Sequence, residues 1–264
     1  MTARERRENG GGDPQRMTVL LGIDCATQPR KTGLALGELN DGRVCILRCA
    51  TASNSRPPAL VAEEWLQGCD EVLIALDAPL GWPHALGEEL SIHQAGMPLA
   101  ERADRLFARE TDRAIAERLG KRPLEVGANL IARTAVAALA LLEQLGQMTE
   151  RTIPLAWSPR DRGPWSAIEV YPAATRIAHE APDHGGSLEG LEALLDCSGV
   201  SLAVLACADA ADACVCALAA ADFLLERAVP PTDLEVARRE GWIWASARPS
   251  VSPSQVIGEW SRPS

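Results

Sequence analysis

Residues 18–50 read TVLLGIDCATQPRKTGLALGELNDGRVCILRCA, and this stretch decides the expected fold. Three apolar runs follow one another in it, at 18–24, 32–39 and 43–50. The Asn-Asp-Gly sequence at 40–42 separates the second run from the third, and it favours a tight hairpin turn. The stretch therefore predicts three strands joined as a meander.

The rest of the chain alternates between helical and strand patterns. Residues 59–68 (ALVAEEWLQG) have helical spacing, whereas 71–81 (EVLIALDAPLG) form a continuous apolar run that is typical of a buried parallel strand. The pattern is helical from about 82 to 148, strand-like at 166–172 (SAIEVYP) and helical again from about 206 to 227. A meander followed by strand–helix crossovers predicts an α/β, RNase H-like fold, in which a mixed sheet has flanking helices and a helical insertion.

The chain has 264 residues, and we expect a single RNase H-like domain at 17–248, with the helical insertion at about 82–148. Polar, glycine-rich residues predict a disordered leader at 1–16, and the Pro/Ser-rich end predicts a flexible tail at 249–264. Since there is neither a secretory signal nor an apolar run long enough to cross a bilayer, we expect a cytoplasmic protein without a membrane partner.

The eight cysteines include no C-x-x-C pair, and most of them lie in apolar strand or helix patterns. A zinc site would need such closely spaced pairs. We therefore expect reduced thiols that act as small core residues.

Four acidic side chains fall at the ends of the predicted strands or in the last long helix. Asp24 ends the first strand, Asp77 ends the strand after the first helix, Glu169 lies in a later strand and Asp212 lies in the helix. A buried carboxylate is costly unless it is paired or bound to a metal ion. Oxygen-only ligands favour Mg²⁺ or Mn²⁺, so these residues predict a site for one of those ions.

Each acid also has a purely structural alternative. Asp24 and Asp77 would shape the turns that follow them. Asp209 and Asp212 are three residues apart and share a helix face, but Asp209 is the better candidate for a helix cap. Asp222 would only solvate the same helix.

Five short motifs in order, GIDCAT, ALDAPLGWP, RETDR, EVYP and DAADACVCALAAADFLLE, resemble the DUF429 family over roughly Val19 to Ser246. The family is regarded as a group of predicted nucleases with an RNase H-like fold, so the resemblance implies that fold and that activity. It places Asp24, Asp77, Glu169 and Asp212 at the acidic positions of the family's motifs.

The RETDR segment matches the family's R-x-x-D-R motif, in which Arg109 and Arg113 would contact a substrate phosphate. The alternative is an exposed helix whose charged side chains pair with one another, with Asp112 as one partner. Trp82 and Tyr171 would line the mouth of the site, or pack in the core as aromatic side chains commonly do.

These observations predict a metal-dependent phosphodiester hydrolase, a nuclease of the RNase H-like type. Asp24 would bridge two Mg²⁺ or Mn²⁺ ions, Asp77 and Asp212 would each hold one, and Glu169 would orient a water molecule or complete a metal shell. The partner would be nucleic acid or another phosphate-containing substrate, although the net charge of −10 counts against nucleic acid.

Two other functions stay open from the sequence. A phosphotransferase of the sugar kinase, actin and Hsp70 type shares this fold, but it needs two such domains around ATP. A non-catalytic binding module would keep the acids for structural reasons.

Overall fold

The computed structural model describes residues 18–127 and 129–248, and it contains one mixed sheet of six strands in the order β5-β4-β1-β2-β3-β6. The strands are β1 (Val19–Asp24), β2 (Gly33–Asn40), β3 (Arg43–Thr51), β4 (Val72–Asp77), β5 (Trp165–Glu169) and β6 (Leu195–Asp196).

The strand order confirms the predicted fold class. β1, β2 and β3 pair antiparallel, whereas β4 pairs parallel with β1 and β5 parallel with β4. The turn between β2 and β3 has positive φ at Asp41 (49°) and Gly42 (81°), as the hairpin signal requires. A meander extended on its first-strand side by two parallel strands is the RNase H-like arrangement. The short strand β6, parallel to β3, was not predicted.

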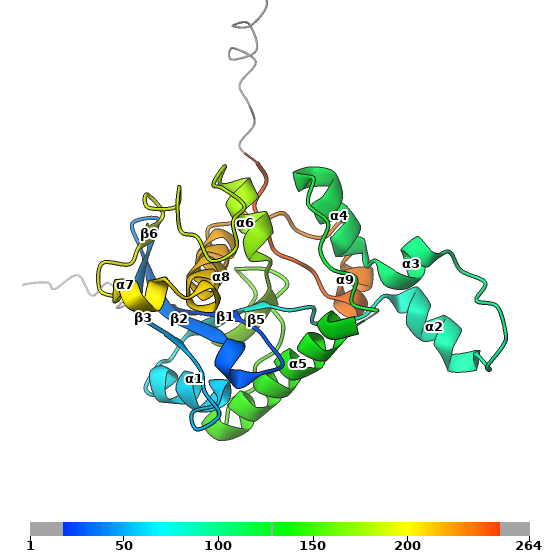
Figure 1. Cartoon of the computed structure of the whole chain (residues 1–264), viewed down its shortest axis with the longest axis horizontal. Coiled ribbons are helices and arrows are strands. Elements are labelled where there is room, and N and C mark those ends of the chain that lie inside the picture. Colours follow the sequence, from blue (N-terminus) through cyan, green and yellow to red (C-terminus); the bar gives the residue numbers. More distant parts are fainter. Residues whose placement is uncertain (1–17, 128, 249–264) are drawn as a thin grey trace, which may run out of the picture.

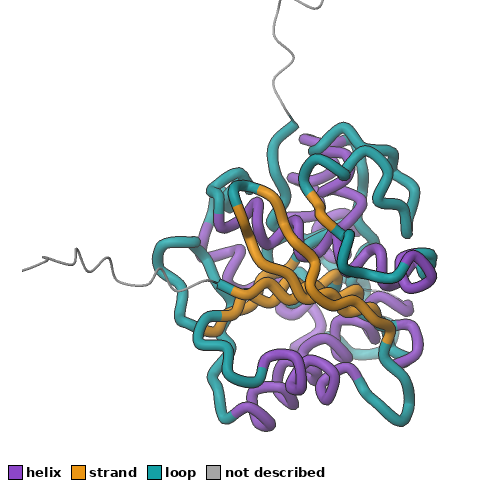
Figure 2. The backbone as a smooth tube through the Cα atoms, turned by 90° about the vertical axis from the view of Figure 1, so that its left-hand side faces the viewer, coloured by secondary structure: helices purple, strands orange, loops and turns teal. Residues whose placement is uncertain are grey.

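Helices cover both faces of the sheet, which lies between them in Figure 2. α8 packs along β1, β2, β3 and β4 on one face, whereas α1 and α5 pack together on the other (Figure 1). The helices are η1 (Pro29–Lys31), α1 (Pro58–Leu66), α2 (His84–Ile92), α3 (Ala103–Phe107), α4 (Glu110–Leu119), α5 (Asn129–Thr149), α6 (Pro172–Ala178), α7 (Leu202–Leu205), α8 (Ala208–Leu224) and α9 (Leu234–Glu240).

Alternation along β1 and β4 decides which side chains reach α8. Leu20 and Leu73 belong to the core under α8, whereas Leu21 and Ile74 belong to the core under α1 and α5. Gly22 lies on the α8 side, where an added Cβ would come within 2.1 Å of the carbonyl oxygen of Ala213. Strand and helix therefore approach closely just before the end of β1, at Asp24.

The region that was expected to be a helical insertion holds α2, α3, α4 and α5 between β4 and β5. α5 covers the sheet beside α1, while α2 and α3 project from the body of the molecule (Figure 1). The predicted leader at 1–16 and tail at 249–264 lie outside the described residues. Among the helices described, none combines the length and hydropathy that a bilayer crossing requires.

Candidate metal centre

Asp24 and Asp77 lie side by side at the carboxyl ends of two neighbouring parallel strands. The β1–β4 register pairs Asp24 directly with Asp77, so both side chains emerge on the same face of the sheet. Neighbouring strands are about 4.8 Å apart, which leaves the two carboxyl groups within reach of one shared cation. The strand alternation directs both toward α8, which carries Asp212.

Burial, with repulsion from neighbouring carboxylates, raises the pKa of both carboxyl groups. Burial raises the pKa of Asp24 to about 9, and the charges of Asp77, Asp212 and Asp209 add to the rise. The pKa of Asp77 rises to about 8, through burial first and then through Asp212 and Glu169. At neutral pH the pair therefore holds protons, unless a cation takes their place.

Asp212 is bound by an arginine that the sequence did not single out. Arg176, buried on α6, donates from Nη2 to Oδ1 of Asp212, and its Nε donates to the carbonyl oxygen of Ser187 at 3.0 Å. The backbone N–H of Gly186 donates to the same oxygen of Asp212 at 3.0 Å. The positive charge of Arg176 lowers the pKa of Asp24 and of Asp77, against the larger effect of burial. Arg176 is thus a fixed cation within the acidic cluster.

Glu169 leaves the sheet on the opposite face. The register pairs it with Leu76, the residue before Asp77, so the period of two places it on the side of α1 and α5. It is 3% exposed, and its Oε2 accepts the backbone N–H of Leu80 at 2.9 Å. Glu169 therefore supports the turn that follows Asp77 instead of pointing at Asp24.

Arg109 is the main partner of Glu169 and lies inside the protein. Its two terminal nitrogens bind the two oxygens of Glu169 at 2.7 and 2.9 Å, and Nη2 also binds Asp112 at 2.9 Å. Burial lowers the pKa of Arg109, but Glu169 and Asp112 outweigh it and raise the pKa overall. Arg109 is 1% exposed, and each of its guanidinium nitrogens donates to Glu169, Asp112 or the carbonyl oxygen of Glu240.

Arg113, the other arginine of the RETDR segment, is exposed, and its Nη1 donates to the carbonyl oxygen of Ala108 at 2.6 Å. The segment is not the wholly exposed charged helix of the second interpretation, because Arg109 and Asp112 are buried. Arg109 instead forms a buried ion pair with Glu169, which links the start of α4 to the end of β5.

A cavity of about 180 Å³ has both Asp77, from the acidic pair, and Glu169, the partner of Arg109, in its lining. Tyr171 lines it too, and burial, with Asp77 and Asp183, raises the pKa of Tyr171 to about 12. Leu124, 72% exposed, forms part of the same lining. Trp82 is not among the lining residues.

Two further acids of α8 have partners elsewhere. Asp209 lies 3.9 Å from Nζ of Lys31 and not at a helix cap. Asp222 was expected to face water, but it is 1% exposed and bonds Nε2 of His179 at 2.6 Å. The long-range contact with α6 buries it, which helical spacing alone does not indicate.

The donor set suits a hard divalent cation, because it consists of carboxylate oxygens withdrawn from water. In the conformation shown, no three His, Cys, Asp or Glu side chains within 18–127 and 129–248 are close enough together to hold a metal ion. Asp24 and Asp77 face each other, while Asp212 is bonded to Arg176. All eight cysteines are free thiols.

Comparison with known proteins places this chain by family. No curated protein matches the sequence. The structure is similar to that of T. thermophilus RuvC in complex with Holliday junction substrate, with 13% sequence identity, 81% of this chain and 99% of that chain covered, and a TM-score of 0.36. At that level no property of the other protein is transferred. A family described as "Protein of unknown function (DUF429)" matches residues 22–236, and the chain belongs to that family.

Proposed function

We propose that this protein is a divalent-metal-dependent phosphodiester hydrolase of the nuclease class. One observation carries the proposal, the direct pairing of Asp24 with Asp77 at the carboxyl ends of β1 and β4. Burial raises the pKa of both carboxyl groups, neighbouring carboxylates raise it further, and a shared cation removes that conflict. Asp24 and Asp77 would hold Mg²⁺ or Mn²⁺, with Asp212 as a further ligand.

A bound divalent ion would supply a water molecule of lowered pKa and positive charge for a phosphate oxygen. The chain's own residues prepare the place for it. Arg176 and the N–H of Gly186 position Asp212, and Arg176 contributes permanent positive charge beside the acids. Phosphate esters carry negative charge, so such a centre favours a phosphodiester over a neutral substrate.

Glu169 and Arg109 enter the proposal as supports of the site. Their ion pair, with the bond from Glu169 to the N–H of Leu80, holds the turn after Asp77 against the start of α4. Arg113 is exposed, so it remains a candidate contact for a substrate phosphate.

A melting experiment with and without metal tests the proposal. In metal-free buffer, millimolar Mg²⁺ or Mn²⁺ should raise the melting temperature, because an ion that binds only the native state stabilises it. Asp24→Asn should lose most of this response. Asp70→Asn, at an exposed acid just before the start of β4 and so at the opposite end of the strand from Asp77, is the control and should keep it.

Activity is measured on short single- and double-stranded DNA and RNA with each metal. Metal-dependent cleavage that Asp24→Asn abolishes supports the nuclease. If ATP and not metal raises the melting temperature, a phosphotransferase is the better account. If neither ligand has an effect and no polymer is cut, the acids belong to a non-catalytic binding module.

A further inference from the structure

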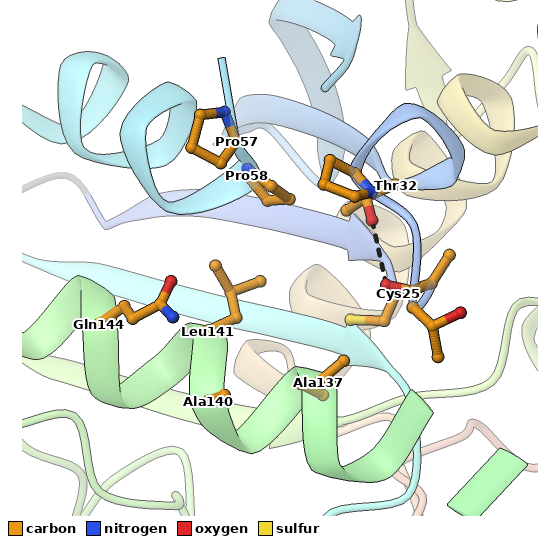
Figure 3. Close-up of a pocket in the computed structure, with 12 residues that line it drawn as sticks. Cys25, Thr32, Pro57, Pro58, Ala137, Ala140, Leu141 and Gln144 are labelled. Atoms are coloured by element: carbon orange, nitrogen blue, oxygen red, sulfur yellow. Dashed lines mark hydrogen bonds between the residues drawn. The ribbon is translucent and has the colours of Figure 1, made fainter. Parts of the chain in front are cut away.

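A second cavity, of about 230 Å³, lies between the segment that follows β1 and the helix α5 (Figure 3). Cys25, the residue directly after Asp24, lines this cavity and also the cavity that contains Asp77. The two cavities therefore have one lining residue in common, directly after the end of β1. Asp77 lines the first cavity and Cys25 lines both, so a nucleotide whose phosphate lies at Asp77 would reach the second cavity past Cys25, around the carboxyl end of β1 from the α8 side to the side of α1 and α5.

The lining of this cavity contains no charged side chain. Of its twelve residues four are alanines and three are prolines. The hollow exists because α5 presents Ala137, Ala138 and Ala140 where larger side chains would fill the space, and Figure 3 shows Ala137 and Leu141 on this side of the helix. Prolines in the facing segments restrict the opposite wall, since their φ angles are locked. The cavity is thus a stiff, uncharged slot beside a strongly acidic centre.

Size and polarity limit what fits. The volume lies below the roughly 300–1,000 Å³ of pockets that take drug-sized ligands, so the slot suits one compact ring system. Thr27 and Gln144 are exposed members of the lining, and an amide such as that of Gln144 both donates and accepts hydrogen bonds. An uncharged ring with polar edges meets these conditions better than an alkyl chain does.

We propose that this cavity is a subsite for the nucleobase next to the phosphodiester held at Asp24 and Asp77. The inference rests on the proposed function, and it narrows the substrate to a nucleotide whose base is unstacked. A base within a duplex cannot enter the slot, so the substrate is single-stranded nucleic acid or a strand with an extruded base. The uncharged lining can contribute base contacts and no phosphate contacts.

The test uses two fluorescently labelled single-stranded DNA hexamers. One carries normal bases, and the other is abasic, with a hydrogen atom in place of the base on every sugar. Binding is followed by fluorescence anisotropy in millimolar Ca²⁺, and cleavage is followed separately in Mn²⁺. Wild-type protein should bind the normal hexamer about tenfold more tightly than the abasic one, the size expected for one sheltered base.

Ala137→Phe fills the slot and should abolish this difference. Val136→Phe adds the same bulk at a neighbouring position of α5 that is 59% exposed, so it should keep the difference. If Ala137→Phe does not fold, Gln144→Ala removes only a polar group at the rim and should reduce the preference about threefold, in line with the loss of one hydrogen bond.

Equal binding of the two hexamers by wild-type protein overturns the subsite, and so does an undiminished preference in Ala137→Phe. Cleavage without base preference overturns the subsite alone. Base preference without metal-dependent cleavage overturns the nuclease and keeps the subsite. If wild-type protein binds neither hexamer, both proposals fail.

Discussion

Asp77→Asn should make the metal-free protein more stable and should remove its response to metal. Asp77 is the more deeply placed member of the acidic pair, and asparagine has nearly the same shape without the charge. The substitution ends the repulsion from Asp24 and Asp212, and it also removes a ligand that the cation needs. The two effects have opposite signs, so the presence of metal should invert the order of stability.

The pKa of Asp77 sets the size of the effect. It is 3.8 in the unfolded chain and about 8 in the folded protein. The folded state therefore holds a proton that the unfolded state has released, and stability falls as the pH rises from about 4 to about 8. At pH 7 this proton linkage costs at most about 4 kcal/mol. We expect Asp77→Asn to recover roughly 2–4 kcal/mol at pH 7 and little at pH 4, where the pH is close to the unfolded pKa and the linkage has almost vanished.

Urea denaturation in EDTA at pH 4, 7 and 8 measures this directly, and a second series contains millimolar Mg²⁺. Asp70→Asn is the control, because Asp70 is an exposed acid just before the start of β4, at the opposite end of the strand from Asp77, and its loss should change stability by less than about 1 kcal/mol. Metal-free Asp77→Asn that is less stable than wild type at pH 7 would refute the reasoning. So would a variant that still gains stability from Mg²⁺.

Three further predictions test other parts of the structure. Arg109→Met should destabilise the protein by about 3–5 kcal/mol in urea, since it strands two buried carboxylates, and a loss below 1 kcal/mol would argue against the buried network. Gly22→Ala should cost more than about 2 kcal/mol by the same measurement, because its Cβ would lie 2.1 Å from the carbonyl oxygen of Ala213. Gly87→Ala, with open space around it in α2, should be neutral or stabilising by up to about 1 kcal/mol, and equal losses at the two glycines would contradict the close packing of α8. Titration with a thiol reagent should find eight thiols in denaturant but few in the native protein, and prompt native reaction at buried Cys216 would oppose the structure.

The sheet was predictable because its signals are local. The Asn-Asp-Gly turn at 40–42 determines the β2–β3 hairpin, and an apolar run that ends in a carboxylate marks each of Asp24 and Asp77. The carboxyl ends of neighbouring parallel strands meet at one edge, so the two residues were expected at one place. Their direct pairing follows from a register without offset between β1 and β4.

The remainder of the site depends on register and on long-range contacts that local patterns do not contain. Glu169 ends β5 as expected, but its pairing with Leu76 turns it to the other face of the sheet. If β5 were shifted by one residue along β4, Glu169 would lie on the face of Asp77, and Val170 would lie on the opposite face. Arg109 looks like a surface residue in an arginine-rich helix, and its burial arises from a partner 60 residues away.

Of the residues around the acidic pair, Arg176 was the hardest to predict from the sequence. It follows Pro172 by one turn of α6, directly after the strand that ends in Glu169. An arginine one turn into a helix that starts beside the acidic edge of a sheet is a candidate partner for the carboxylates at that edge. Its partner on α8 is known only once the two helices are packed together.

A crystal grown without metal and then soaked in Mn²⁺ tests the central claim most directly, through the anomalous signal of manganese. The account predicts a peak within about 2.0–2.3 Å of carboxylate oxygens from both Asp24 and Asp77. A well-ordered site with no anomalous peak between these two side chains, at a Mn²⁺ concentration that raises the melting temperature, would contradict it.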